Sequence, residues 1–351
     1  MTAIVLDLND ILNAVTGTPD VAATSLRILQ SASILRESNF DVIAVVTQPP
    51  APIGRIKKIT PSPVQVAAEE LSIAVFSPEK AKDEDFLSAL EALSPDLCIT
   101  AAYGNYLPKR FLSIPKCGTI NIHPSLLPKY RGAAPAQRCL EAGDYVSGVT
   151  VLFTVQKMDA GPIIRQHECV LSGQEKAPDF LVDMFSIGTK LLIEALPSVF
   201  NGDILNEVIQ QDESQATAAD KLSASEARTD FSCLSAVQIH NKARGLAGWP
   251  GLWSTFTTVS EGSIESEPQR IKIITTELKI LSKDAPTRDI LVIKDKKREL
   301  LQVVCGDGSI LSISEVQPSG KKVMPVRDFV NGLRGSTLRW TIPPLPEASD
   351  T

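Results

Sequence analysis

The first half of the chain alternates short apolar runs with runs at helical spacing, and this pattern restricts the fold more than any other feature. The apolar runs are rich in β-branched residues and bounded by Pro or Gly, as buried strands usually are. Residues 77–93, between two of these runs, open with Ser77-Pro78 and then carry apolar side chains at helical spacing from Phe86 to Leu93. Strands that alternate with helices predict an α/β fold with a mostly parallel sheet, whose ligands bind beyond the carboxyl ends of the strands. The strand-like runs are NFDVIAVVTQPP, PDLCITAAYG, CGTINIHP and GVTVLFTV.

The rest of the chain predicts a second domain of different character. Residues 177–200 form one helical pattern that closes a first domain, which spans residues 1–200. Residues 201–230 are polar and weakly periodic, and we expect a linker there. Between residues 231 and 345, short β-rich runs separated by Gly-Asp-Gly and Pro-Ser-Gly turns predict a small β-barrel.

The composition argues against several classes of protein. The 351-residue chain has a formal net charge of -6, so it lacks the generally basic surface of an unselective nucleic-acid binder. No apolar stretch is long enough to span a bilayer, so we expect no membrane contact. The six cysteines are scattered without a CxxC pair, which predicts free thiols rather than disulfides or a zinc site. Neither a secretory signal nor an Arg-rich transit peptide is visible.

Two polar residues end the run GTINIHP. Strand alternation turns Asn121 and His123 to one side and the two isoleucines to the other. Pro124 cannot extend the ladder, so the pair lies at the strand terminus, where ligands of α/β sheets bind. A capping Asn beside a hydrogen-bonded core His would also explain the pattern, and this strand alone does not decide between the two interpretations.

The neighbouring loops favour a functional site. The segment PSLLPKYRGAAPAQR carries Lys129 and Arg131, and such loops hold anionic ligands through backbone amides and Arg side chains. Asp159 follows the next strand in the turn MDAG, although an Asp before Gly is often only a turn residue. Together, an amide and an imidazole can stabilise a developing oxyanion, while a carboxylate orients the imidazole and helps to collect a proton.

The stretch NIHPSLLPKYRGAAP, with MDAG downstream, resembles the formyltransferase family that uses 10-formyltetrahydrofolate. Longer motifs are similar to the methionyl-tRNA formyltransferases, and some of their variants look like plant-type organellar members. The similarity extends over residues 17–334. The longer motifs are TQPPAPIGRIKKITPSPV, AAYGNYLP, QDESQATAADKLSASEARTDF, GLAGWPG and PSGKK.

The resemblance implies a Rossmann-like formyltransferase domain, followed by a tRNA-binding barrel of the OB type. It implies that the chain transfers the formyl group of 10-formyltetrahydrofolate to the α-amino group of methionyl initiator tRNA, for translation initiation. Asn121 and His123 would stabilise the tetrahedral oxyanion, and Asp159 would hold His123 and help to remove the amine proton.

The resemblance also implies where the two substrates bind. The folate would lie against residues 101–104, and residues 125–128 would form the wall beside the formyl group, although the two leucines there could simply anchor the loop. No metal is expected. The predicted folate residues are Ala101, Ala102, Tyr103, Gly104, Ser125, Leu126, Leu127 and Pro128.

Basic residues are predicted to contact the tRNA. In the family, the loop containing Arg55 enters the acceptor end of the tRNA, and Lys57 and Lys58 could contact phosphates. By themselves these residues, like the hairpin pair Lys321 and Lys322, would be interpreted as a solvated face. The predicted tRNA-binding residues are Arg55, Lys57, Lys58, Lys221, Lys321 and Lys322.

The sequence departs from the family at its beginning. Family members usually begin with an apolar strand that leads directly into a Gly turn, but here ILNAV before Gly17 is a poor strand. The earlier run AIVLDL could be the strand, yet it lies too far from the turn. We therefore expect the first strand to be missing or altered.

Two alternative functions remain open. A glycinamide ribonucleotide or sugar-amine formyltransferase would share Asn121, His123 and Asp159 but would not need the barrel motifs. An RNA-binding module with a vestigial catalytic domain is a second alternative, and retention of all three residues argues against it. We expect a monomer, and the motif variants suggest a mitochondrion or plastid, with a bacterial cytoplasm as the alternative.

Overall fold

The chain divides into two compact units, and each is described by itself. The computed structural model describes residues 2–6, 20–35, 40–53, 58–102, 106–260, 263–264, 266–278, 289–295, 298–333 and 335–342. Unit 1 comprises Met1–Ala136, Tyr145–Leu171 and Pro178–Lys221, and unit 2 comprises Gln137–Asp144, Ser172–Ala177 and Leu222–Thr351. The two units are therefore interleaved along the sequence.

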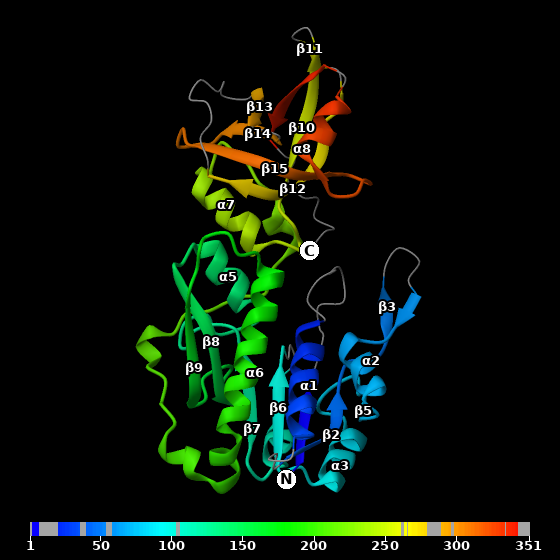
Figure 1. The fold of residues 1–351 in the computed structure, drawn as a ribbon, viewed down its shortest axis with the longest axis vertical. Coiled ribbons are helices and arrows are strands. Elements are labelled where there is room, and N and C mark those ends of the chain that lie inside the picture. The colour runs from blue at the N-terminus through cyan, green and yellow to red at the C-terminus, as the bar shows by residue number, and fades with distance from the viewer. Residues whose placement is uncertain are drawn as a thin grey trace. The chain divides into compact units, whose positions relative to one another are not determined.

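Unit 1 is built on a seven-stranded sheet in the order β5-β2-β1-β6-β7-β8-β9 (Figure 1). The first five of these strands pair in parallel, whereas β8 and β9 are antiparallel. This confirms the predicted α/β fold with a mostly parallel sheet. The bounds are β1 Thr2–Leu6, β2 Asp41–Val46, β5 Ala74–Phe76, β6 Leu97–Ala101, β7 Thr119–His123, β8 Val146–Phe153 and β9 Ile163–Val170.

The expectation of a missing first strand is wrong. Strand β1 lies between β2 and β6 and pairs with both in parallel. The short run TAIVL therefore occupies the position that ILNAV was too polar to fill. The structure resolves the spacing problem by placing the strand early in the chain, and residues 7–19 lie outside the described residues.

Helices cover both faces of this sheet. Gly188 of α6 lies so close to β7 and β8 that a Cβ there would be 2.5 Å from Ile122 Cγ2 and 2.7 Å from Val149 Cγ2. Ser25 of α1 accepts a hydrogen bond from Thr189 of α6, so both helices cover this face. Helix α3 packs on the opposite face, where Phe86 and its neighbours form a cluster with Cys98. The bounds are α1 Asp20–Ser33, α2 Pro63–Glu70, α3 Glu84–Leu93, α4 Lys109–Ser113 and α6 Ala177–Asn201.

The segment expected to be a linker follows unit 1 closely. Ile209 pairs with Ile163 at the beginning of β9, and Ala218 pairs with Arg131. Short 3-10 helices at Asp203–Asn206, Glu213–Gln215 and Ala224–Ala227 shape the rest of the segment. Most of residues 201–221 thus belongs to the folded body of unit 1.

Unit 2 contains a mostly antiparallel sheet in the order β11-β10-β12-β15-β14-β13-β17, and β10 also pairs with β17. Phe231 packs in its core, with ring centroids 6.2 Å from Phe256 and 5.7 Å from Trp340. The bounds are β10 Trp253–Ser260, β11 Ser263–Ile264, β12 Gln269–Glu277, β13 Asp289–Asp295, β14 Arg298–Val304, β15 Ile310–Pro318, β16 Met324–Pro325, β17 Thr337–Thr341, α5 Pro135–Ala142, α7 Ala236–Gly245 and α8 Val326–Asn331.

Helix α7 holds the two early segments of unit 2 through buried polar side chains. His240 Nε2 donates to the carbonyl of Gly173 (2.9 Å), so Nδ1 accepts from the Thr276 hydroxyl (2.8 Å). Arg244 donates to the carbonyl of Glu175 (3.3 Å) and lies 3.7 Å from its carboxylate. Burial lowers the pKa of His240 and of Arg244. Among the described residues, no helix is long and apolar enough to cross a membrane.

Candidate active site

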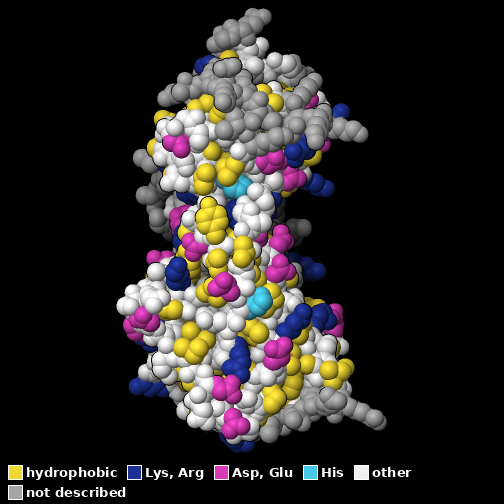
Figure 2. All heavy atoms as spheres, turned by 60° about the vertical axis from the view of Figure 1, so that its left-hand side comes forward, with side chains coloured by type: hydrophobic (Ala, Val, Ile, Leu, Met, Phe, Trp, Pro, Cys, Tyr) yellow, Lys and Arg dark blue, Asp and Glu magenta, His cyan; other side chains and the backbone are white. Residues whose placement is uncertain are grey.

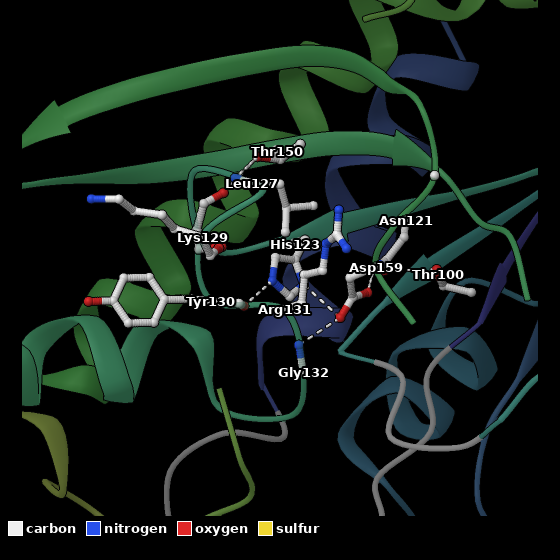
Figure 3. A network of polar contacts seen from close by, with 12 residues as sticks. Thr100, Asn121, His123, Leu127, Lys129, Tyr130, Arg131, Gly132, Thr150 and Asp159 are labelled. Atoms are coloured by element: carbon white, nitrogen blue, oxygen red, sulfur yellow. Dashed lines mark hydrogen bonds and ion pairs between the residues drawn. The ribbon is translucent and has the colours of Figure 1, made fainter. Parts of the chain in front are cut away.

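Asn121, His123 and Asp159 meet at the carboxyl end of β7 (Figure 3). Ile120 and Ile122 are fully buried, and the two polar side chains of β7 point to the opposite side. Asn121 Nδ2 donates to Asp159 Oδ1 at 3.4 Å, and His123 Nδ1 lies 3.7 Å from Asp159 Oδ2. The structure therefore brings together an amide and an imidazole from strand β7 with a carboxylate from the loop after β8.

The imidazole of His123 has one fixed nitrogen and one that faces Asp159. Nε2 lies 2.8 Å from the carbonyl oxygen of Tyr130. Because a carbonyl only accepts hydrogen bonds, Nε2 carries the proton and Nδ1 presents its lone pair toward Asp159 in the neutral ring. The side chain of His123 is only 5% exposed and that of Asp159 15%, so this pair lies in a partly dehydrated site.

Asp159 is held by its neighbours in a left-handed backbone conformation, with φ 47°. Its Oδ2 accepts from the backbone N–H of Gly132 at 2.9 Å. Gly161, two residues later, allows the loop to approach β8, since a Cβ there would lie 1.7 Å from the carbonyl oxygen of Phe153. These contacts fix the carboxylate on the side where Asn121 and His123 lie.

Thr100 sets the orientation of the Asn121 amide. Its buried hydroxyl donates to Asn121 Oδ1 at 2.8 Å. The amide NH₂ group of Asn121 must therefore face the opposite way, toward Asp159 and the space in front of the site. The sequence gives no sign of this role for Thr100, because a Thr in a buried strand is an ordinary β-former.

The loop after β7 is anchored by internal contacts. Ser125 is buried and donates to the carbonyl of Lys129 (2.8 Å), while Leu127 packs with Leu152 and Ile163. The Thr150 hydroxyl donates to the Ser125 carbonyl (2.7 Å). Leu126 and Pro128 are half-buried beside them. This region offers a rigid wall of loop backbone next to His123.

The interpretation of Arg131 as an anion-binding residue is wrong. Its guanidinium donates to Gln211 Oε1 through Nε (3.0 Å) and Nη2 (2.7 Å), and to Glu213 through Nη1 (3.0 Å). The Arg131 side chain is 10% exposed. Gln211 and Glu213 accept the hydrogen bonds of its guanidinium, and the Glu213 carboxylate balances its charge. Lys129 is exposed.

Gln211, like Thr100, is a site residue that the sequence pattern does not predict. Its Nε2 donates to the carbonyl oxygens of Asp159 and Gly161, both at 2.8 Å. The motif beginning QDES was noticed for its resemblance, but a polar segment gives no local sign of contacts with residues some fifty positions away. Its position between two loops is visible only in the fold.

The other predicted residues lie apart along the chain. Ala101 ends β6 and is buried, and Ala102 is exposed with φ 59°, whereas Tyr103 and Gly104 lie outside the described residues. Lys58 is exposed at the beginning of β4 (Lys58–Thr60), which pairs with β3 (Ala51–Ile53). Arg55 and Lys57, in the connection between these strands, also lie outside the described residues.

The remaining basic residues are exposed. Lys221 ends unit 1, and Lys321 and Lys322 lie at the tip of the β15–β16 hairpin, where the Lys321 N–H donates to the Pro318 carbonyl (3.0 Å). On the face of the molecule drawn in Figure 2, Lys and Arg side chains stand among Asp and Glu side chains. On this face, a phosphate contact would therefore depend on individual residues rather than on a uniform basic field.

None of the six cysteines forms a disulfide, and all six lie among the described residues. Burial raises the pKa of Cys98 to about 12, so this thiol has no thiolate character near neutral pH. Within the described ranges, no group of three or more His, Cys, Asp or Glu could hold a metal ion. Asn121, His123 and Asp159 are the polar side chains that the structure brings together at the end of β7.

Known proteins are similar to this chain over nearly its full length. A family model described as "Formyl transferase" matches residues 10–196, and one described as "Formyl transferase, C-terminal domain" matches residues 221–334. Methionyl-tRNA formyltransferase of Staphylococcus epidermidis is 37% identical over 91% of this chain and 96% of its own. That of Lysinibacillus sphaericus is 36% identical over 92% and 96%.

Solved structures share the fold at low sequence identity. An N-formyltransferase from Helicobacter canadensis, in complex with folinic acid and dTDP-3-aminofucose, is 15% identical, with a TM-score of 0.55 over 90% of this chain and 98% of its own. HypX from Aquifex aeolicus, in complex with tetrahydrofolic acid, is 15% identical, with a TM-score of 0.58 over 95% of this chain and 47% of its own. With two matching family models and relatives at this identity over nearly its full length, the chain belongs to the methionyl-tRNA formyltransferase family.

Proposed function

We propose that this chain transfers the formyl group of 10-formyltetrahydrofolate to the α-amino group of methionine on initiator tRNA. The observation that carries the proposal is the convergence of Asn121, His123 and Asp159 at the end of β7 in a chain of this family. The similarity to methionyl-tRNA formyltransferases over more than 90% of the chain argues for a tRNA substrate rather than a sugar amine or glycinamide ribonucleotide.

The amine nitrogen attacks the formyl carbon, and the carbonyl oxygen takes up negative charge. The Asn121 NH₂ group, oriented by Thr100, donates a hydrogen bond to this oxyanion. His123 and Asp159 share the proton that leaves the amine, because Nδ1 faces Asp159 Oδ2 while Tyr130 keeps the Nε2 proton in place. The bond from carbon to N10 then breaks, N10 takes a proton, and formylmethionyl-tRNA and tetrahydrofolate are released.

The two substrates would both bind beside this trio. The folate lies against residues 101–104 and the wall of residues 125–128, where backbone groups can meet the pterin ring. The tRNA acceptor end meets Arg55, Lys57 and Lys58, while Lys221, Lys321 and Lys322 neutralise phosphates. The exposure of Lys58, Lys321 and Lys322 is compatible with these contacts.

The sheet of unit 2 would be the small, OB-like barrel that the sequence predicts. The pairing of β10 with both β12 and β17 supports this barrel, because β10 then has a neighbouring strand on either side. We further propose that the enzyme acts as a monomer. The plant-type motif variants support an organellar member in a mitochondrion or plastid.

Formyl transfer to charged initiator tRNA tests the function directly. The purified chain is incubated with 10-formyltetrahydrofolate and either methionyl initiator tRNA or methionyl elongator tRNA. Rapid formylation of the initiator and slow formylation of the elongator are expected. Equal activity on both tRNAs, or activity on neither, would refute the proposal.

A further inference from the structure

Asp159 is held from two sides, and both supports depend on residues 211–219. Its carboxylate accepts from the Gly132 N–H, and its backbone carbonyl accepts from Gln211. Gly132 is itself held against this segment, since a Cβ on it would lie 2.7 Å from the carbonyl oxygen of Ala219. The position of the carboxylate thus depends on a segment distant in sequence from both loops.

Both the NH₂ group and the oxygen of the Gln211 side-chain amide are fully engaged in hydrogen bonds. Nε2 donates to the carbonyls of Asp159 and Gly161, both at 2.8 Å, and Oε1 accepts twice from Arg131, at 2.7 and 3.0 Å. An amide with both donors and its acceptor engaged has a single orientation. Gln211 therefore joins the loop that carries Asp159 to the loop that carries Tyr130 and Gly132.

Arg131 completes this link through its backbone. Its N–H donates to the Thr217 carbonyl at 2.8 Å, and the Ala219 N–H donates to the Arg131 carbonyl at 2.6 Å. Arg131 lies between Tyr130, whose carbonyl holds His123, and Gly132, whose N–H holds Asp159. Displacement of Arg131 would therefore move both supports of the catalytic pair.

We propose that Gln211, with Arg131, is a positioning residue for formyl transfer, which acts by fixing Asp159 relative to His123. The inference rests on the proposed function, because it takes Asp159 as a group that touches the reacting atoms. Gln211 contacts Asp159 and Gly161 only through their backbone carbonyls, so its role is geometric.

The test is the single-turnover rate of formylation at saturating folate and initiator tRNA. Gln211→Ala is expected to lower this rate about 10- to 100-fold, as misplacement of a catalytic group does, while KM for both substrates changes less than about twofold. Gln211→Glu, similar in size, keeps an acceptor for Arg131 but loses both donors, so it should show the same loss and remain informative if the Ala variant folds poorly.

A matched control lies in the same segment. Gln215 is exposed, and its Nε2 donates to Asp212 Oδ2 (2.8 Å), so Gln215→Ala should retain the wild-type rate. A double-mutant cycle completes the test. If Gln211 acts through Asp159, Gln211→Ala should cause little further loss in an Asp159→Ala background.

Three outcomes would overturn the inference in an active wild-type enzyme. They are a wild-type rate in both Gln211 variants, a loss confined to KM, and a full additional loss in the Asp159→Ala background. A wild-type chain that fails to formylate initiator tRNA would refute the proposed function first, and the inference with it. The two failures are therefore distinguishable.

Discussion

His123 Nε2 and the carbonyl oxygen of Tyr130 lie 2.8 Å apart, and this hydrogen bond decides which ring nitrogen of the imidazole is free. The carbonyl keeps the proton on Nε2, so only Nδ1 can exchange a proton with Asp159 or a substrate. The loop that supplies the carbonyl follows β7 directly, with Tyr130 at φ 63°. The turn that contains Tyr130 thus fixes both the orientation of the His123 ring and its tautomer.

His123→Ala should lower the formylation rate about 10²- to 10⁴-fold, because it removes the imidazole that helps to take up the amine proton. Thermal unfolding should show that the fold is retained. The chain offers a matched control in His167, which is exposed on β9, and His167→Ala should keep full activity. Near wild-type formylation by His123→Ala would rule out its assigned role.

Thr100→Val should lower kcat about 3- to 10-fold, because the hydrogen bond that orients the Asn121 amide is lost while the side-chain volume is conserved. Thr100→Ser, which keeps the hydroxyl, should restore most of the activity. Thr119→Val is the matched control, since the buried Thr119 hydroxyl has no partner among the described residues. Steady-state kinetics on all three variants would measure this, and equal losses at both positions would argue against the orienting role.

Arg55→Ala should raise KM for initiator tRNA by on the order of 10-fold and leave KM for the folate unchanged, because it removes a charge from the proposed acceptor-end contact. The tRNA effect should shrink as salt is raised. Arg27, exposed and paired with Glu70 at 2.6 Å, provides an Arg→Ala control without effect on either substrate. Equal losses for tRNA and folate would refute the contact.

The free energy of unfolding of unit 2 should fall as the pH drops below about 6.5, the ordinary pKa of histidine. Burial lowers the pKa of His240 in the folded state, with a smaller effect from Arg244, so the unfolded chain binds the proton more readily. Stability is therefore full above the unfolded pKa and is lost as the pH falls through the folded one.

Unfolding in denaturant between pH 5 and 8 measures this effect. Trp249, Trp253 and Trp340 are the three tryptophans of the chain and all belong to unit 2, so their fluorescence reports its unfolding. His240→Gln should be less stable at pH 8 and show a flatter dependence on pH. A variant with the wild-type pH dependence would show that another group controls it.

Features encoded by local spacing could be predicted from the sequence. The helix predicted within residues 77–93 is α3, because the apolar spacing there matches the helix period, although it begins at Glu84 after the cap Asp83 rather than at Ser77-Pro78. Residues 177–200 likewise form α6. The two-residue period of a strand placed Asn121 and His123 on one face, and Pro124 placed them at its end.

Features that depend on distant partners could not be predicted. Arg131 appeared free for an anion because its partners lie eighty or more positions away in a polar segment. The run AIVLDL was an open alternative for the first strand, and only the usual spacing to the Gly turn argued against it. Parallel pairing requires only that the strand reach its place between β2 and β6. The partners of Arg131 and the pairing of β1 depend on contacts between distant segments, which produce no periodic pattern in the sequence.

The interleaving of the two units has a consequence for biosynthesis. Gln137–Asp144 and Ser172–Ala177 leave the ribosome well before Leu222–Thr351, to which they belong. The carbonyl groups of Gly173 and Glu175 therefore lack their partners His240 and Arg244 until α7 has been synthesised. No single cut separates the units, so a fragment ending at residue 200 would also lack Gln211 and Thr217. Expression of either half alone should therefore yield an incomplete fold, because neither half contains all the segments of one unit.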